Sequence, residues 1–183
     1  MTNLSLHKYA IVDLLSLADM LDKDYYDVII SLCQGAINSA NKLRDLEDRH
    51  PTSQYIILCN NLISEILTCI EKRKEYFIPY IHELHEKNKT SHDCGNCSGK
   101  CNMLHELKLV ELKESDTRVK DILSHLQMMS LPLHAETIYP DNYRLLRNQM
   151  ILLENTLSDL LYLEETYLVP KISEAQKSIN AHA

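Results

Sequence analysis

The chain has 183 residues, a formal net charge of −7 and 45% apolar residues, so it is long enough to bury one sizeable core. Three glycines, five prolines and no tryptophan are typical of a helical protein, as is the abundance of leucine, isoleucine, glutamate and lysine. The negative charge and the lack of a basic run exclude a general nucleic-acid binder and a protein that binds anionic membranes.

No segment reaches the roughly 20 consecutive apolar residues that a membrane span needs. The N-terminus has no basic start followed by an apolar run, which is the pattern of a secretory signal. We therefore expect a cytoplasmic protein, in which thiols stay reduced. The six cysteines are then expected as metal ligands or buried small side chains rather than as a disulfide framework.

Apolar residues spaced by three and four predict helices along the chain and no series of strands. Ser5 and Asp24 would cap the first two helices, and Ser115 with Asp116 would cap a helix that restarts after a break. The expected helices span about 5–21, 24–48, 53–90, 101–114, 115–131 and 142–178.

These helices predict an all-α fold with one domain over residues 1–183. Residues 52–178 would form an antiparallel four-helix bundle, and residues 1–50 would add extra N-terminal helices. Two of the long helices share a similar stretch with an internal proline, at residues 75–81 and 166–172. This similarity indicates an internal duplication or two helices that kink near one end of the bundle.

Residues 92–105 form a loop with three of the six cysteines and two of the three glycines. Thiolate and imidazole are the ligands that zinc and iron prefer, and the glycines would let the short loop turn back on itself. This spacing predicts a tetrahedral Cys₃His site, with zinc closed off from solvent and therefore structural. The candidate ligands are Cys94, Cys97, Cys101 and His105, with His92 as the competing fourth ligand.

Two other interpretations of this loop stay open. The first is a disulfide between neighbouring cysteines, with the histidines turned away. The second is an iron–sulfur cluster, whose fourth thiolate would come from Cys33, Cys59 or Cys69.

Two carboxylates and two histidines are expected inside the bundle. Glu164 interrupts an apolar stripe that includes Leu157, Leu160 and Leu168, and a buried carboxylate is costly unless it is paired or binds a metal. Such groups on several helices form di-iron or di-manganese sites. The set is Glu164, Glu114, His125 and His85. In the alternative, Glu114 ends its helix in solvent, Glu164 pairs with a lysine and the histidines lie on the surface.

Residues 62–172 resemble the hemerythrin-like domain of the RIC (repair of iron centres) proteins. The resemblance rests on the stretch at 73–81, on Lys113-Glu114, on Ser124-His125 and on the last helix through Glu164 and Pro170. It implies a four-helix bundle with a di-iron centre, acting in iron–sulfur centre repair, iron handling or the response to redox and nitrosative stress.

The chain departs from that family at three ligand positions. Val110 and Leu160 replace histidines, and the middle of the first bundle helix, near Cys69, Glu71 and Arg73, lacks the expected histidine. Only Glu114, His125, Glu164 and His92 match the family's ligands, so a di-iron centre would be incomplete.

Two functions follow from these patterns, and an enzyme is the less favoured class because no hydrolase motif is present. In the first, the chain is a metal-binding hemerythrin-like protein that uses iron. In the second, it is a non-enzymatic helical module with a degenerate di-iron site and a structural zinc in the loop. That module would bind a protein or hydrophobic partner through its N-terminal helices.

Overall fold

A computed structural model describes residues 7–44, 50–90, 100–135 and 141–181. Within these ranges the chain is helical and contains no strand, which confirms the all-α prediction. Among the helices of these ranges, none has both the length and the apolar composition that crossing a membrane requires.

The N-terminal part is a short helix, α1 (His7–Ala10), followed by a long segment made of α2 (Leu14–Leu21), η1 (Asp22–Tyr26) and α3 (Asp27–Arg44). Asp13 separates α1 from α2, because its Oδ1 accepts a hydrogen bond from the Ser16 backbone N–H at 2.9 Å and caps α2. The predicted helix over 5–21 is therefore two helices. No break occurs at Asp24, which lies inside the continuous segment.

Three further long segments follow. The second is α4 (His50–Lys72), η2 (Arg73–Phe77) and α5 (Ile78–Lys89). The third is the single helix α6 (Lys100–Ala135), and the fourth is α7 (Asp141–Leu163), η3 (Glu164–Leu168) and α8 (Val169–Ala181). The expected break after residue 114 was wrong, because α6 runs through Ser115 and Asp116 without interruption.

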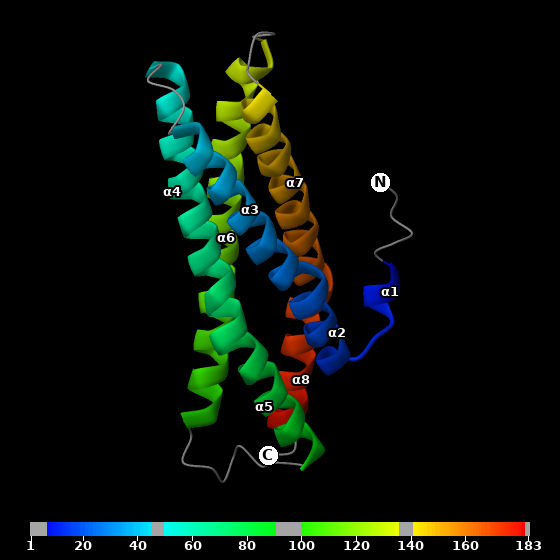
Figure 1. The fold of residues 1–183 in the computed structure, drawn as a ribbon. Coiled ribbons are helices and arrows are strands. Elements are labelled where there is room, and N and C mark those ends of the chain that lie inside the picture. Colours follow the sequence, from blue (N-terminus) through cyan, green and yellow to red (C-terminus); the bar gives the residue numbers. More distant parts are fainter. Residues whose placement is uncertain (1–6, 45–49, 91–99, 136–140, 182–183) are drawn as a thin grey trace.

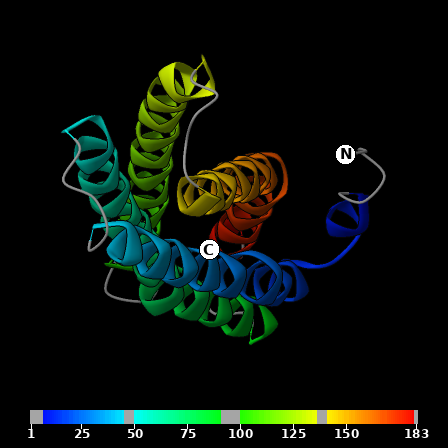
Figure 2. The same cartoon turned by 45° about the horizontal axis from the view of Figure 1, so that its top comes forward.

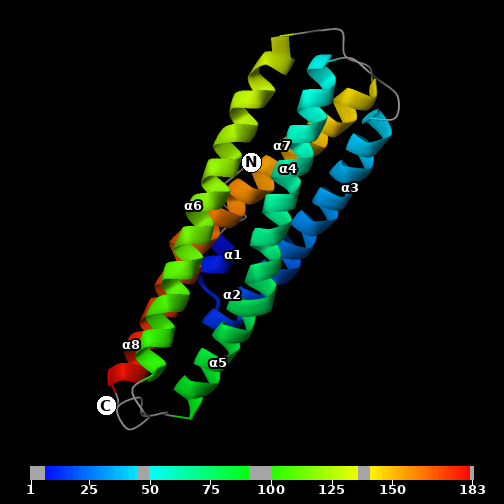
Figure 3. The ribbon, with the colours of Figure 1, turned by 90° about the vertical axis from the view of Figure 1, so that its left-hand side faces the viewer.

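The four long segments lie side by side, and successive ones run in opposite directions (Figures 1 and 3). α3 packs against α4 and α7, α6 packs against the same two helices, and α5 packs against α2 and α8. Seen closer to the long axis, α3, α4, α6 and α7 surround a common interior, while α1 lies outside them (Figure 2). The N-terminal segment is therefore one wall of this interior, not an addition to a bundle completed by residues 52–178.

The interior is filled by leucine, isoleucine, tyrosine and cysteine side chains from all four segments. Its fully buried members include Leu21 and Ile29 of the first segment and Ile70 of the second. Each such side chain contributes roughly 1.5–3 kcal/mol by leaving water. Few polar groups are buried among the described residues, namely Ser39, Arg73, Asp116 and Glu164.

Three of the four segments contain one π-helical turn: η1, η2 and η3. In each turn a backbone N–H donates to the carbonyl five residues back: Asp27 to Asp22, Ile78 to Arg73 and Val169 to Glu164. Pro79 and Pro170 follow η2 and η3 directly after these donors. A proline has no N–H and clashes with the carbonyl four residues back, so the wider turn accommodates both prolines inside long helices.

Candidate functional site

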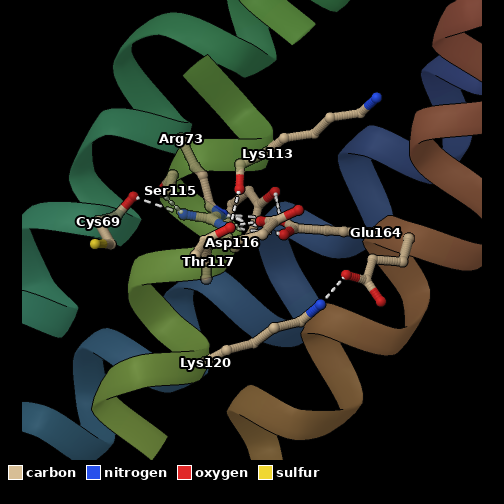
Figure 4. A network of polar contacts seen from close by, with 10 residues as sticks. Cys69, Arg73, Lys113, Ser115, Asp116, Thr117, Lys120 and Glu164 are labelled. Carbon is tan, nitrogen blue, oxygen red and sulfur yellow. Dashed lines mark hydrogen bonds and ion pairs between the residues drawn. The ribbon is translucent and has the colours of Figure 1, made fainter. Parts of the chain in front are cut away.

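Side chains from all four long segments meet in one buried polar cluster at the level of the π-helical turns. Figure 4 shows Arg73, Asp116 and Glu164 converging there. Its centre is the ion pair between Arg73 of η2 and Glu164 of η3. Arg73 Nε donates to Glu164 Oε1 at 2.9 Å, and Arg73 Nη2 donates to Glu164 Oε2 at 3.0 Å. Both carboxylate oxygens therefore face the guanidinium in a bidentate pair.

The remaining guanidinium hydrogens are also used. Arg73 Nη2 donates to Asp116 Oδ1 at 2.5 Å, and Nη1 donates to Ser115 Oγ at 2.6 Å and to the Cys69 carbonyl at 3.2 Å. An arginine side chain has five N–H donors, and these contacts give each of them an acceptor. Tyr26 of η1 completes the cluster by donating its O–H to Glu164 Oε1 at 2.8 Å.

The cluster is closed to solvent. Arg73 and Glu164 are 0% exposed, Tyr26 is 1% exposed and Asp116 is 4% exposed. Burial alone would lower the pKa of Arg73, but the charge and hydrogen bonds of Glu164 raise it, so Arg73 stays a cation. Burial, followed by the charge of Glu164, raises the pKa of Asp116 to about 8, although Arg73 acts in the opposite direction.

The π-helical turns also carry most of the ion pairs between segments that the structure describes. Lys74 of η2 pairs with Asp22 and with Asp27, at 2.8 Å for the latter. Glu165 of η3 pairs with Lys120 of α6. These pairs are more exposed than the central one and surround it, so the charged contacts between segments concentrate at one level of the molecule.

The residues predicted to line a bundle metal site do not come together. Glu164 is buried and has donors within reach, which confirms that it faces the interior. Glu114 was expected on the inward face of its helix, and this was wrong, because it is exposed and Ser115 and Asp116 face inward instead. His125 is exposed, with Nδ1 2.9 Å from the Asp121 carbonyl of its own helix.

The last predicted bundle ligand, His85, is half-buried on α5. Among the residues whose side chains are described, no group of three or more His, Cys, Asp or Glu could hold a metal ion. The predicted loop ligands are outside this part of the chain: His92, Cys94 and Cys97 precede α6, and the side chains of Cys101 and His105 in its first turns are not described.

The arrangement does not fit the di-iron centre that the family resemblance implied. A metal ion at Glu164 would need the two carboxylate oxygens, and both already accept hydrogen bonds from Arg73, at 2.9 and 3.0 Å. The guanidinium also brings a positive charge to the place where a cation would sit, and Coulomb repulsion in a buried site opposes both being there.

A groove opens beside the cluster, between α4 and η2 on one side and α6 on the other. It has a volume of about 360 Å³. Cys69 and Ser115 form part of its lining and also contact Arg73, so they separate the groove from the buried guanidinium. The remaining lining residues are aromatic, hydroxylic or charged: Thr68, Lys72, Tyr76, Phe77, Lys108, Glu111, Glu114 and Arg118.

Arg73, Asp116 and Tyr26 were not predicted as site residues. Arg73 lies between Ile70 and Phe77 in the apolar stripe of its helix, with spacings of three and four. The argument that placed Glu164 inside would therefore have placed Arg73 inside as well. Asp116 was assigned to a helix cap. It lies three residues before Val119, which is buried, and this spacing also predicts an inward-facing side chain.

Comparisons with known proteins do not supply a relative. No protein-family model matches the chain, and no curated protein and no solved structure matches it.

Proposed function

We propose that this chain is a non-enzymatic helical binding module in which an ion-pair cluster takes the place of a bundle metal centre. The observation that carries the proposal is that Glu164, the most strongly inward-facing of the expected metal ligands, is bound through both oxygens by Arg73. Because every N–H of Arg73 has an acceptor, the cluster is complete without a metal ion or a substrate.

In this proposal the four long segments form an antiparallel four-helix bundle that has kept the shape of a hemerythrin-like domain and lost its di-iron chemistry. The cluster joins all four segments and fixes their register, which is the best-attested use of buried polar groups in helical assemblies. Its role is structural: no described group near it is placed as a nucleophile with an adjacent base.

The metal in this proposal is a structural zinc held by Cys94, Cys97, Cys101 and His105, with His92 as the rival for the fourth position. Its support is the ligand spacing and the place of these residues in the chain. They lie between the end of α5 at Lys89 and the first turns of α6, which begins at Lys100. A closed zinc site would restrain this connection and contribute to folding.

The N-terminal helices bury their apolar residues Leu17, Leu21 and Ile29 inside the molecule, which leaves less apolar surface for the partner that the sequence suggested. The groove between α4 and α6 is the alternative. It offers aromatic side chains and charges of both signs, including Tyr76, Lys72 and Glu114. This composition suits a polar protein segment as the partner.

Elemental analysis of protein purified without chelator tests the metal assignment. We expect one zinc and no iron per chain. The variant Cys97→Ser should lose the zinc, and the matched variant Cys69→Ser, which removes a thiol outside the loop, should keep it. Two irons per chain with an oxo-bridge absorption would overturn the proposal. No bound metal, with the loop cysteines reacting equally fast with and without chelator, would overturn its zinc site.

A further inference from the structure

We propose that Asp116 and Glu164 form a buried proton-binding site, in which one exchangeable proton joins two carboxyl groups beside the single positive charge of Arg73. The carboxyl of Asp116 comes from α6 and that of Glu164 from η3. Both contact the same nitrogen, Arg73 Nη2, at 2.5 and 3.0 Å. The inference does not depend on the zinc loop.

The charge count requires the proton. Two ionised carboxylates and one guanidinium would leave a net charge of −1 in a region where Arg73 and Glu164 are 0% exposed. Burying an uncompensated charge is costly, and a group in that position takes up a proton instead. One proton makes the cluster neutral.

The geometry also provides a place for the proton. One oxygen of Asp116 and one of Glu164 lie against the same nitrogen, Arg73 Nη2, at 2.5 and 3.0 Å, so the two carboxyl groups are neighbours, and a hydrogen bond that joins them would hold the proton. Two carboxylates have no donor between them, so such a bond exists only when one of them is protonated. Glu164 already accepts hydrogen bonds from Tyr26 and Arg73, whereas the described donor to Asp116 is Arg73. Asp116 is therefore the carboxyl that carries the proton.

The other groups around Asp116 agree with this assignment. The charged groups that face Asp116 are Arg73 from η2 and both Glu164 and Glu165 from η3. Tyr26 from η1 stays neutral, because burial and then the charge of Glu164 raise its pKa. Glu165 is itself paired with Lys120 in an exposed contact. The pKa of Asp116, raised to about 8 by burial and then by Glu164, means that the proton is held at neutral pH.

Release of the proton has a structural consequence for α6. Asp116 lies on the buried stripe of α6 between Leu112 and Val119, and α6 alone of the long segments has no π-helical turn. An ionised Asp116 would repel Glu164 across the interface between α6 and η3. We therefore expect α6 to be held less tightly to the other segments as pH rises through about 8.

Infrared spectroscopy of the whole chain tests the proton directly. At pH 7 we expect a band from a protonated carboxyl, which disappears as pH rises through about 8 and is missing from Asp116→Asn at pH 7 and above. The matched variant Glu165→Gln should keep the band. A spectrum of the wild type with no protonated carboxyl at pH 7 would overturn the proposal, and this measurement needs no variant to fold.

Unfolding by urea tests the consequence. The folded state holds a proton that the unfolded chain has released between the ordinary pKa of 3.8 and about 8, so stability falls as pH rises in this window. Relative to Asp116→Asn, the unfolding constant of the wild type should rise by up to about tenfold per pH unit between pH 6 and 8. Equal slopes in the two proteins would contradict the proposal.

Discussion

Arg73 and Glu164 occupy the same position in two similar segments of the sequence and bind each other across the interior. Each lies six residues before a proline, at Pro79 and Pro170, and each begins a π-helical turn. Their side chains form the buried bidentate pair at 2.9 and 3.0 Å. The similarity of the two stretches therefore extends to their geometry, while their charges are opposite and complementary.

The turn η1 has a related pattern without a proline. Asp22 begins it as Arg73 begins η2, and Tyr25 stands three residues later, where the other two turns have Tyr76 and Tyr167. In all three turns the first residue is charged and takes part in an ion pair between segments. Three related turns at one level place the charged contacts of three segments within reach of each other.

Replacing Arg73 alone should be strongly destabilising. In Arg73→Leu, Glu164 and Asp116 lose their only described cation, and breaking a buried pair costs about 3–5 kcal/mol. The double variant Arg73→Leu with Glu164→Leu should recover most of this loss, because apolar side chains often replace a buried pair without penalty. Urea unfolding measures the stability of the single and the double variant. A double variant as unstable as Arg73→Leu would contradict this prediction.

The exposed ion pair beside the cluster provides the control for that experiment. Lys120 and Glu165 are each 51% exposed. Solvent screens such pairs, so Lys120→Leu should change the free energy of unfolding by about 0–1 kcal/mol.

Tyr26→Phe removes one hydrogen bond and little volume. Tyr26 of η1 donates its O–H to Glu164 Oε1. Without this O–H, the described donor to that oxygen is Arg73 alone. A hydrogen bond to a charged group contributes about 1.5–3 kcal/mol. We expect a loss of that size in urea unfolding, and much less in Tyr76→Phe, because Tyr76 is 52% exposed.

The sequence predicts the helices well, because apolar spacing reports which face of each helix is buried. It also predicts that Glu164 lies inside, since the carboxylate interrupts an otherwise apolar stripe. It fails at Ser115 and Asp116, whose preference for helix caps is a local rule that a tertiary contact overrides. Asp116 stays in mid-helix because Arg73 donates a hydrogen bond to its carboxyl group, and no local pattern contains that information.

The error at residue 115 also changes the identity of the four segments. Two short helices were expected over 101–131, and the N-terminal helices were treated as additional. Because α6 is one continuous helix, residues 50–181 form three long segments, and the fourth consists of α2, η1 and α3. The partner of Glu164 was missed for a related reason: a cation was expected among the lysines, whereas a fully buried arginine needs acceptors from several segments, and these are known only from the fold.

The cap of α2 should be sensitive to substitution and to acid. Asp13 accepts from the backbone N–H and from the side-chain hydroxyl of Ser16, at 2.9 and 2.7 Å. Asp13→Ala should cost about 1 kcal/mol, and Asp13→Asn much less, since asparagine is also a good cap.

The hydrogen bonds from Ser16, the backbone one first, lower the pKa of Asp13 below its ordinary value of 3.8. A lowered folded pKa means that the contribution is present above the ordinary value and lost as pH falls through the folded one. The difference between wild type and Asp13→Asn should therefore shrink in acid. A difference that stays constant from pH 6 to pH 2.5 would contradict this.

The prolines after η2 and η3 are expected to follow from the π-helical turns, not to cause them. The turn η1 forms with Val28 at the corresponding position, so a π-helical turn here does not require a proline. In Pro79→Ala the Arg73–Glu164 pair should hold η2 in place, and alanine at position 79 favours the helical conformation more than proline does. An interior proline costs a helix about 3 kcal/mol relative to alanine, and the wider turn has already relieved much of that cost.

We therefore expect Pro79→Ala to unfold at the same urea concentration as the wild type or at a higher one. Pro170→Ala, which changes the proline that follows η3, is the matched variant and should unfold in the same way. The pH-dependent carboxyl band of Asp116 reports whether the cluster has kept its geometry, and it should be unchanged in both variants. A loss of about 3 kcal/mol together with a shifted band would show that the prolines set the turns, because only a change of helix register moves Arg73 or Glu164 away from Asp116.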